Sequence, residues 1–256
     1  MSLFHDGILE HVYPAFFKAM SNPDHIGIAL SISMAGYVLG GSSYFQALLF
    51  GSLWAGLIYY CCHDIYNSYM MGRLSTDMAD IQASYLENPD NGFWVAEADV
   101  NGQAKVVGMV AVVGKSGEEE GERFDDLNGG VSMVAVVGKS GEEEGERFDD
   151  LNGGVSNRDF NQDTGDRGYA HMRHAVVAFA WRRRSLGSQL TRKALDFCKE
   201  RGFSRLVVDL SSPQTAAICM CQKLGFVQTA SHCNTHANRW FAKLATINVM
   251  QMEKLI

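Results

Sequence analysis

The residues with the clearest chemical potential form a short basic run, Trp181-Arg182-Arg183-Arg184-Ser185-Leu186-Gly187. The run lies between a strand-like segment, Tyr169–Phe179, and an amphipathic segment, Ser188–Arg201, whose apolar residues have helical spacing. The first N–H groups of a helix lack acceptors within the helix, and together with the helix dipole they attract anions. Three arginines add positive charge, and small residues let the backbone approach a phosphate closely. The run therefore predicts a phosphate-binding turn.

Two other interpretations compete for the same basic run. A solvated helix start can carry three arginines without binding any ligand, and the run taken alone does not decide between this and an anion site. A nuclear-localisation signal also uses basic triplets. Trp181 and Leu186 argue against that signal, because they favour burial of the segment within a fold.

Six cysteines form the other set of reactive residues: Cys61, Cys62, Cys198, Cys219, Cys221 and Cys233. Their spacing does not match paired metal-ligand motifs, so we expect no metal site. A chain of this length does not need disulfides, which favours a reducing compartment for the catalytic part. The pair Cys61-Cys62 fits either palmitoylation or two ordinary buried thiols.

The charge balance of the chain argues against a nucleic-acid partner, because its 256 residues carry a net charge of −7. The acidity is concentrated in Lys115–Ser132, which sums to −4 and recurs at Lys139–Ser156, leaving +1 for the rest. The acidic character therefore belongs to a repeat and says little about partners of the fold.

An exact tandem repeat of 24 residues underlies this pattern, since Met109–Ser132 and Met133–Ser156 are identical. Solenoids need at least three repeats, so two identical copies predict a duplication rather than a repeat architecture. The first copy continues a strand-like run, so we assign it to the fold and treat the second as an insertion. Its Met133–Val137 run is expected at a sheet edge or loosely on the surface.

A charge-free stretch from Ile26 to Cys62 predicts a membrane anchor. One helix of that length would measure roughly 55 Å, well beyond a hydrocarbon core of about 30 Å. Gly40-Gly41-Ser42-Ser43 would break it, which leaves a hairpin of Ile26–Leu39 and Tyr44–Cys62, or one span over Tyr44–Cys62. A buried hairpin in a soluble protein is a third possibility. The aromatic residues Trp54, Tyr59 and Tyr60 fit an interfacial belt.

The remaining patterns predict helices and strands in an order typical of an α/β fold. Helices are expected over Phe4–Met20, over Thr76–Leu86, and from Ser211-Ser212-Pro213 to Leu224. Strands are expected over Phe93–Ala98, Val106–Val113 and Leu206–Leu210. Strand-like runs are expected within Trp240–Ile256.

The basic run resembles the Arg/Gln-x-x-Gly-x-Gly/Ala signature of the GNAT acetyltransferase superfamily. Ala217-Ile218 and Lys223-Leu224-Gly225-Phe226 fit the second half of that pattern. Within the superfamily, the chain resembles the camello-type N-acetyltransferases, on the segments Thr76–Ile81, Phe93–Glu97 and Val107–Ala111. The resemblance covers nearly the whole chain apart from the inserted copy.

The resemblance implies a GNAT fold, which is a central mixed β-sheet flanked by helices, with a hydrophobic anchor in its N-terminal region. Residues 1–25 would form the N-terminal helix of the fold, and residues 26–62 a transmembrane or hairpin membrane segment. Residues 63–256 would form the acetyltransferase domain, with the duplicated insertion near 115–156.

The activity that the resemblance implies is direct transfer of acetyl from acetyl-CoA to an amine, without a metal. The amine would belong to a protein lysine, an amino acid or a cysteine S-conjugate, and the membrane to the endoplasmic reticulum. N–H groups near Val177 and Phe179 would hold the thioester and its oxyanion. The phosphates of coenzyme A would be bound by the turn, namely Arg182, Arg183, Arg184, Ser185, Leu186, Gly187 and Ser188.

The candidate catalytic groups are His174 and Cys221. An ammonium with a pKa of about 10 must lose a proton before it can attack, so a base is required. His174 could be that base, with Asp209 as another candidate, or His174 could be an ordinary packed histidine. Cys221 stands where the superfamily often has a tyrosine acid, and it could protonate the thiolate or be an inert buried thiol.

Ser185 is a second departure, because the signature has glycine there. A Cβ is costly if the position needs φ > 0. The alternative to an enzyme is therefore a catalytically impaired acetyl-CoA-binding protein.

Overall fold

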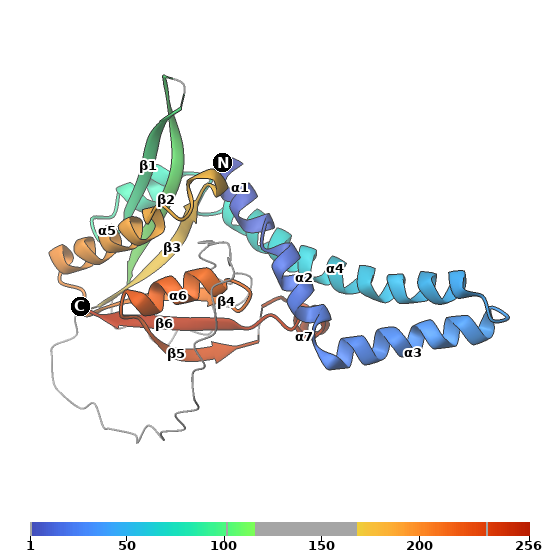
Figure 1. Ribbon diagram of the computed structural model, residues 1–256. Coiled ribbons are helices and arrows are strands. Elements are labelled where there is room, and N and C mark those ends of the chain that lie inside the picture. Colours follow the sequence, from blue (N-terminus) through green and yellow to red (C-terminus); the bar gives the residue numbers. More distant parts are fainter. Residues whose placement is uncertain (1, 101, 116–167, 234) are drawn as a thin grey trace, which may run out of the picture.

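A computed structural model describes residues 2–100, 102–115, 168–233 and 235–256. Within these ranges one sheet has the strand order β1-β2-β3-β4-β6-β5. The strands are β1 (Gly92–Val100), β2 (Gln103–Lys115), β3 (Tyr169–Val177), β4 (Arg205–Ser211), β5 (Val227–His232) and β6 (Val249–Leu255). Among these six described strands, β3 and β4 pair in parallel and the other neighbours are antiparallel (Figure 1). The mixed sheet that the sequence predicts is confirmed.

Helices cover both faces of the sheet. They are α1 (Ser2–Leu9), α2 (Val12–Met20), α3 (Pro23–Leu39), α4 (Tyr44–Ser75), α5 (Leu186–Arg201), α6 (Thr215–Lys223) and α7 (Arg239–Ala245), with a π-turn η1 (Gln82–Leu86) and a 3-10 turn η3 (Phe179–Trp181). Side chains alternate along a strand, so Val176 packs under α1, α2 and α4, whereas Ala175 and Val177 pack under α5 and α6.

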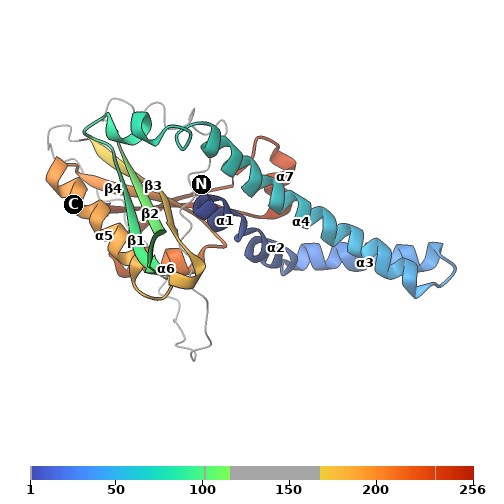
Figure 2. The same ribbon diagram turned by 90° about the horizontal axis from the view of Figure 1, so that it is seen from above.

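A helical hairpin of α3 and α4 projects from the body of the molecule (Figures 1 and 2). The predicted break is confirmed, because Gly40–Ser43 joins the two helices, and Gly41 and Ser42 adopt left-handed backbone angles. The hairpin exposes large apolar side chains, among them Leu30, Met34, Val38, Leu39, Tyr44, Phe45, Leu48 and Leu53. The hairpin is therefore not buried within the described part of the chain. By length and composition, α4 could cross a membrane.

The second half of α4 belongs to the body of the protein. The helix has 32 residues, about 48 Å, and continues past the predicted end at Cys62 to Ser75. Beyond the exposed part, Ile65, Tyr66 and Met70 are buried against the sheet because they recur on one helical face. The predicted helix over Thr76–Leu86 is wrong for its first half, where the chain turns and only η1 is helical.

The predicted helix over Phe4–Met20 is two helices, α1 and α2, separated at Glu10-His11. Pro14 lies in the first turn of α2, where its missing N–H leaves no bond unmade. α1 crosses β3 closely at Gly7, where an added Cβ would lie 2.5 Å from Cγ1 of Val176.

The C-terminal third differs from the sequence prediction in three places. Pro213 precedes α6 rather than opening it, since the N-cap is Gln214, whose Oε1 accepts a hydrogen bond from Ser211 N at 3.0 Å. The strand-like run expected within Trp240–Ile256 is β6, and the unpredicted helix α7 precedes it. The strand β5 was not predicted, because its mostly polar residues lie exposed on an edge strand. The inserted copy, including Met133–Val137, lies outside the described residues.

Candidate active site

A wedge opens in the sheet between β3 and β4. The two strands pair only where Ala170–Met172 faces Leu206–Val208. Beyond that stretch β3 continues to Val177 and β4 to Ser211, and the strands diverge (Figure 1). Backbone N–H and C=O groups that lose a neighbouring strand need other partners. The wedge is therefore suited to an extended ligand that takes the place of a strand.

β3 carries a bulge next to the wedge. Met109 pairs with Val176 and Ala111 with Arg173, so that His174 and Ala175 together oppose a single residue of β2. His174 has φ 51°, a left-handed conformation that is costly for any residue with a Cβ. Such strain persists mainly at functional positions. A bulge also redirects backbone groups, and here it does so where an oxyanion would need N–H donors.

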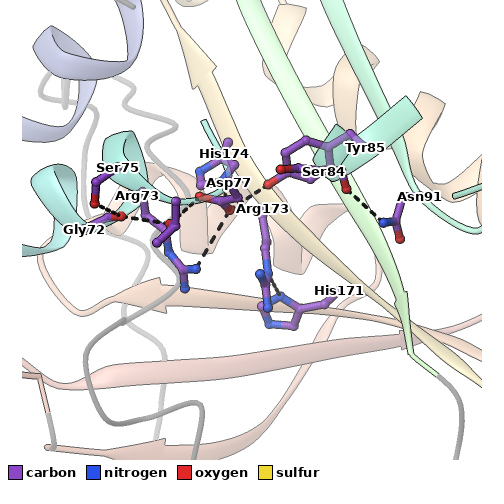
Figure 3. Close-up of polar contacts among 11 residues, drawn as sticks. Gly72, Arg73, Ser75, Asp77, Ser84, Tyr85, Asn91, His171, Arg173 and His174 are labelled. Atoms are coloured by element: carbon purple, nitrogen blue, oxygen red, sulfur yellow. Dashed lines mark hydrogen bonds and ion pairs between the residues drawn. The ribbon is translucent and has the colours of Figure 1, made fainter. Parts of the chain in front are cut away.

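The side chain of His174 points into a buried polar cluster (Figure 3). Its Nε2 lies 2.8 Å from Oδ2 of Asp77, and the hydroxyl of Tyr85 donates to the same oxygen at 2.7 Å. Burial lowers the pKa of His174, and Asp77 offsets this only in part. Burial alone would raise the pKa of Asp77, but hydrogen bonds from His174 and Tyr85 and the charge of Arg73 hold it below its usual value. The pair is therefore a neutral histidine that donates to a carboxylate.

The surroundings of His174 favour a positioning role. The residue is fully buried, and its ring meets those of Phe4 and Tyr85 edge to face. Its Nδ1 has no hydrogen-bond partner in the described part of the chain. An enclosed ring of this kind can fix the bulge of β3, while its predicted role as a base stays a prediction.

A second His–Asp pair lies where the wedge begins. His171 belongs to the paired part of β3, and Asp209 is the first residue of β4 beyond it. Nε2 of His171 lies 3.1 Å from Oδ2 of Asp209, and Nε of Arg173 donates to Nδ1 of His171 at 3.3 Å. The other carboxylate oxygen, Oδ1, is buried without a partner among the residues the structure describes. Because such an oxygen is costly to leave unbonded, it is suited to meet a donor brought by a ligand.

The protonation states of this pair follow from its burial. Burial lowers the pKa of His171, against a smaller opposing effect of Asp209. Burial works to raise the pKa of Asp209, but the neighbouring His171, together with the charges of His232 and Arg173, holds it below its usual value. The pair is a carboxylate beside a neutral imidazole, so the free oxygen of Asp209 can accept a hydrogen bond from a donor.

The basic run forms a turn that leads directly into α5, two residues earlier than predicted. Ser185 is the N-cap, with φ 59° and ψ 10°, so the position does require a left-handed residue. Its side chain makes no capping hydrogen bond, and the first backbone bond back into the helix is from Gln189 N to Ser185 O at 3.0 Å. The N–H groups of Leu186, Gly187 and Ser188 are thus left at an uncapped helix start, an arrangement that is suited to an anion.

The three arginines of the turn have different surroundings. Arg182 donates through Nη1 and Nη2 to the carboxylate of Glu10, at 2.6 and 2.7 Å, and through Nε to Val177 O at 3.0 Å. All three nitrogens of this guanidinium donate to groups within the protein, which favours a positioning role, while the predicted phosphate contact of Arg182 stays a prediction. Arg183 and Arg184 are exposed at the turn, and Arg184 lies 4.7 Å above the ring of Trp181.

Val177 and Phe179 lie at the end of β3, between the bulge and the turn. Ala178 N donates to Val107 O at 2.8 Å, which holds this segment against β2. Phe179 begins η3 and is exposed, with Arg182 5.3 Å above its ring. The predicted contacts of their N–H groups with a thioester stay predictions.

Cys221 is fully buried in α6, and burial raises the pKa of its thiol to about 12. A thiol with so high a pKa is a poor proton donor, so the structure favours the inert-thiol alternative.

Sequence reasoning missed Glu10, Asp77, Tyr85 and His171. A signal for His171 did exist, since the alternation of β3 places it and Arg173 on one face of a buried strand. The pairing of Glu10 with Arg182 joins positions 172 residues apart, and local sequence patterns do not predict a contact over such a separation.

Among the described residues, no group of three or more histidine, cysteine, aspartate or glutamate side chains could hold a metal ion.

Comparisons with known proteins point to one family. The sequence model of the acetyltransferase (GNAT) family matches residues 59–226, more than half of the chain. N-acetyltransferase family 8 member 3 of Mus musculus is 25% identical over 93% of this chain and 84% of its own length. Human N-acetyltransferase 8 is 23% identical over 90% of this chain and 79% of its own length. Human N-acetylaspartate synthetase is 31% identical, over 43% of this chain and 35% of its own length.

Proposed function

The chain belongs to the acetyltransferase (GNAT) family and is an acetyl-CoA-dependent N-acetyltransferase, and we propose that it acetylates its amine substrate in the wedge between β3 and β4 while anchored to a membrane. This family membership agrees with the sequence-based resemblance. The proposed site rests on one observation: the strand β3, which borders the open wedge, leads through a short turn to the uncapped start of α5.

The residues present fit acetyl-CoA. The uncapped N–H groups of α5, with the exposed Arg183 and Arg184, suit the phosphates, and the open edge of β3 suits an extended arm. When bound, acetyl-CoA supplies a thioester whose carbonyl carbon an amine can attack. The turn, which the pair of Arg182 and Glu10 holds in place, would fix the phosphate end of acetyl-CoA, so that the extended arm carrying the thioester lies along β3.

We place the amine at the closed end of the wedge, next to Asp209 and His171. An ammonium donates to the unpartnered Oδ1 of Asp209, and the proton is accepted by the Asp209–His171 pair. The neutral amine then attacks the thioester carbonyl carbon, and redirected N–H groups at the bulge of β3 stabilise the oxyanion. As the C–S bond breaks, coenzyme A leaves as its thiolate, which takes up the proton that the amide nitrogen loses. His174 and Asp77 support this step by holding the bulge in its strained conformation.

We propose that the α3–α4 hairpin is the anchor and that the membrane is the endoplasmic reticulum, the compartment that the family resemblance suggests. Small residues let the two helices pack closely, since a Cβ on Gly36 would meet Phe50 at 2.8 Å and one on Gly51 would meet Ser33 at 2.3 Å. Close packing at small residues is typical of helices within a bilayer. Both ends of the hairpin join the body, so it would enter from one side (Figure 2).

The acceptor amine belongs to an amino acid, a cysteine S-conjugate or a protein lysine. The name of N-acetylaspartate synthetase, which matches 43% of this chain, supports an amino acid. A direct test is to mix membranes that contain the protein with acetyl-CoA and a panel of these three amine classes, and to measure the release of free CoA. Release with one class identifies the acceptor.

Gly187→Glu is the negative control for this assay, because it places a carboxylate at the proposed anion site, and Gly187→Ala is its match because it adds only an uncharged methyl group. CoA release should be lost with glutamate and kept with alanine. Measurable acetyl-CoA binding without acetylation of any amine would support the impaired, non-catalytic alternative.

A further inference from the structure

A hollow of about 730 Å³ lies beside α7, and its lining contains neither His171 nor Asp209. Its lining includes His236, Arg239, Trp240, Lys243, Thr246 and Asn248, and no carboxylate is among the described residues that line it. Arg239 and Lys243 are four residues apart, so they share one face of α7, and both are exposed. Trp240 is 72% exposed, which is unusual for so large an apolar side chain. The hollow thus combines two cations with an exposed indole.

The position of α7 explains this combination. Its Phe241 packs edge to face on Tyr60 of α4 at 6.0 Å, and His236 pairs with Asp64 at 3.3 Å. On α4, Leu57 and Tyr60 are the last exposed large apolar residues before Cys61, where the helix becomes buried in the body of the protein. α7 therefore sits where the apolar hairpin leaves the body, as Figure 1 shows.

The helix α2, which contacts both α4 and α7, carries exposed aromatic residues at the hairpin base as well. Tyr13 and Phe17 of α2 are 60% and 64% exposed, and Tyr13 lies 5.8 Å from Tyr59, the neighbour of Tyr60. Aromatic side chains with a polar tip prefer the boundary between hydrocarbon and water. Residues far apart in the sequence thus form a collar, defined as Tyr13, Tyr60 and Trp240, at the base of one hairpin, with the apolar Phe17 on the same helix as Tyr13.

We propose that the hollow beside α7 binds the phosphate-bearing headgroup of an anionic phospholipid, with Arg239 and Lys243 as its cations and Trp240 at the bilayer surface. The inference rests on the proposed membrane anchoring of α3–α4. If the hairpin spans the hydrocarbon, the collar lies at headgroup level, where basic side chains meet a negative surface. The body of the enzyme would then rest on the membrane in a fixed orientation.

The test uses the full chain reconstituted into vesicles of phosphatidylcholine, or of an equal mixture of phosphatidylcholine and phosphatidylserine. Tryptophan emission is recorded for the native chain and for Trp240→Phe, so that the difference reports Trp240 alone among the four tryptophans. We expect the Trp240 emission to move to shorter wavelength in the mixed vesicles. In the double variant Arg239→Gln/Lys243→Gln, the phosphatidylserine needed should rise about fivefold for each lost cation.

Lys199→Gln, an exposed lysine near the end of α5, is the matched control and should leave the response unchanged. The inference is overturned if both vesicle types give the same emission, if the double variant responds like the native chain, or if free aspartate rather than phosphatidylserine produces the shift. Extraction with alkaline carbonate separates this failure from that of the anchor. A chain that stays in the pellet yet ignores phosphatidylserine refutes only the headgroup site, whereas a chain released from both vesicle types refutes the anchor and the site together.

Discussion

Arg182 and Glu10 form a two-pronged ion pair, with Nη1–Oε1 at 2.6 Å and Nη2–Oε2 at 2.7 Å, between the turn before α5 and the break between α1 and α2. The Arg182 side chain is 6% exposed and the Glu10 side chain 33%. Paired donors and acceptors of this geometry fix orientation as well as distance. The contact thus joins the proposed phosphate turn to the N-terminal helices that continue into the hairpin.

Glu10→Gln should destabilise the protein, because it leaves the Arg182 guanidinium buried without a counter-charge. Removing one partner of a fully buried pair costs 3–5 kcal/mol, and the partial exposure of Glu10 reduces our expectation to about 2 kcal/mol. Thermal unfolding in detergent measures the loss. The turn should also loosen, so the KM for acetyl-CoA should rise.

The double variant Glu10→Leu/Arg182→Met separates charge from packing. Replacing both members of a buried pair by apolar residues is often neutral, so most of the lost stability should return. The KM for acetyl-CoA should stay high, because no contact then orients the turn. A native KM in the double variant would contradict the positioning role of Arg182.

Ser185→Gly should stabilise the protein by about 1 kcal/mol, since a left-handed conformation costs roughly 1–2 kcal/mol for a residue with a Cβ. Binding of acetyl-CoA should be equal or tighter, because glycine also opens the approach to the backbone. The matched control is Ser188→Gly, three residues into the helix, which should destabilise instead. Calorimetric binding and thermal unfolding decide this, and the same sign for both variants would be the contrary result.

We expect a catalytic role for the His171–Asp209 pair and a positioning role for the His174–Asp77 pair. His171→Gln should lower kcat by about 10²- to 10⁴-fold, the usual contribution of a general base, with little change in the KM for acetyl-CoA. His174→Gln should mainly lower the unfolding temperature and leave the pH dependence of kcat unchanged, because its ring is enclosed. A pH–rate profile distinguishes them, and a profile altered by His174→Gln alone would restore His174 as the base.

The sequence predicts those parts of the site that depend on local order. The turn from Trp181 to Gly187 and the interruption at Gly40–Ser43 are both marked by composition, and the structure has both. The wedge is not predictable in this way, since it arises where β3 and β4 stop pairing, and those strands are joined through α5. His171 meets Asp209, and Arg182 meets Glu10, only because tertiary packing brings distant segments together.

Stability should fall as the pH drops from 6.5 towards 4, and His11 should cause much of this. Burial lowers the pKa of His11 from 6.5 to about 4, and Nε2 of the ring has no partner in the described structure. A group with a lowered pKa in the folded state binds its proton more tightly when unfolded. The contribution of neutral His11 to the free energy of unfolding is therefore complete above pH 6.5. It is lost as the pH falls from 6.5 to about 4.

The variant His11→Phe tests this contribution, which corresponds to about 3 kcal/mol across that interval. The free energy of unfolding of the variant should depend less on pH between 4 and 6.5 than that of the native protein. Equal slopes for the two proteins would show that His11 stays neutral in the unfolded chain or is solvated in the folded one.

Charge placed on the exposed face of the hairpin should release the protein from membranes. Leu48 and Leu53 of α4 are 73% and 62% exposed, so lysine at both positions would not disturb packing within the protein. In a bilayer centre each lysine costs about 2.5–3.5 kcal/mol, which is enough to shift insertion strongly. The matched control is Leu86→Lys, because Leu86 is 61% exposed but lies in η1 on the body of the enzyme. Carbonate extraction should leave the native chain and the control in the pellet and move Leu48→Lys/Leu53→Lys towards the supernatant. If the double variant stayed in the pellet like the control, the hairpin could not be the anchor, because its exposed leucines would then face something other than lipid.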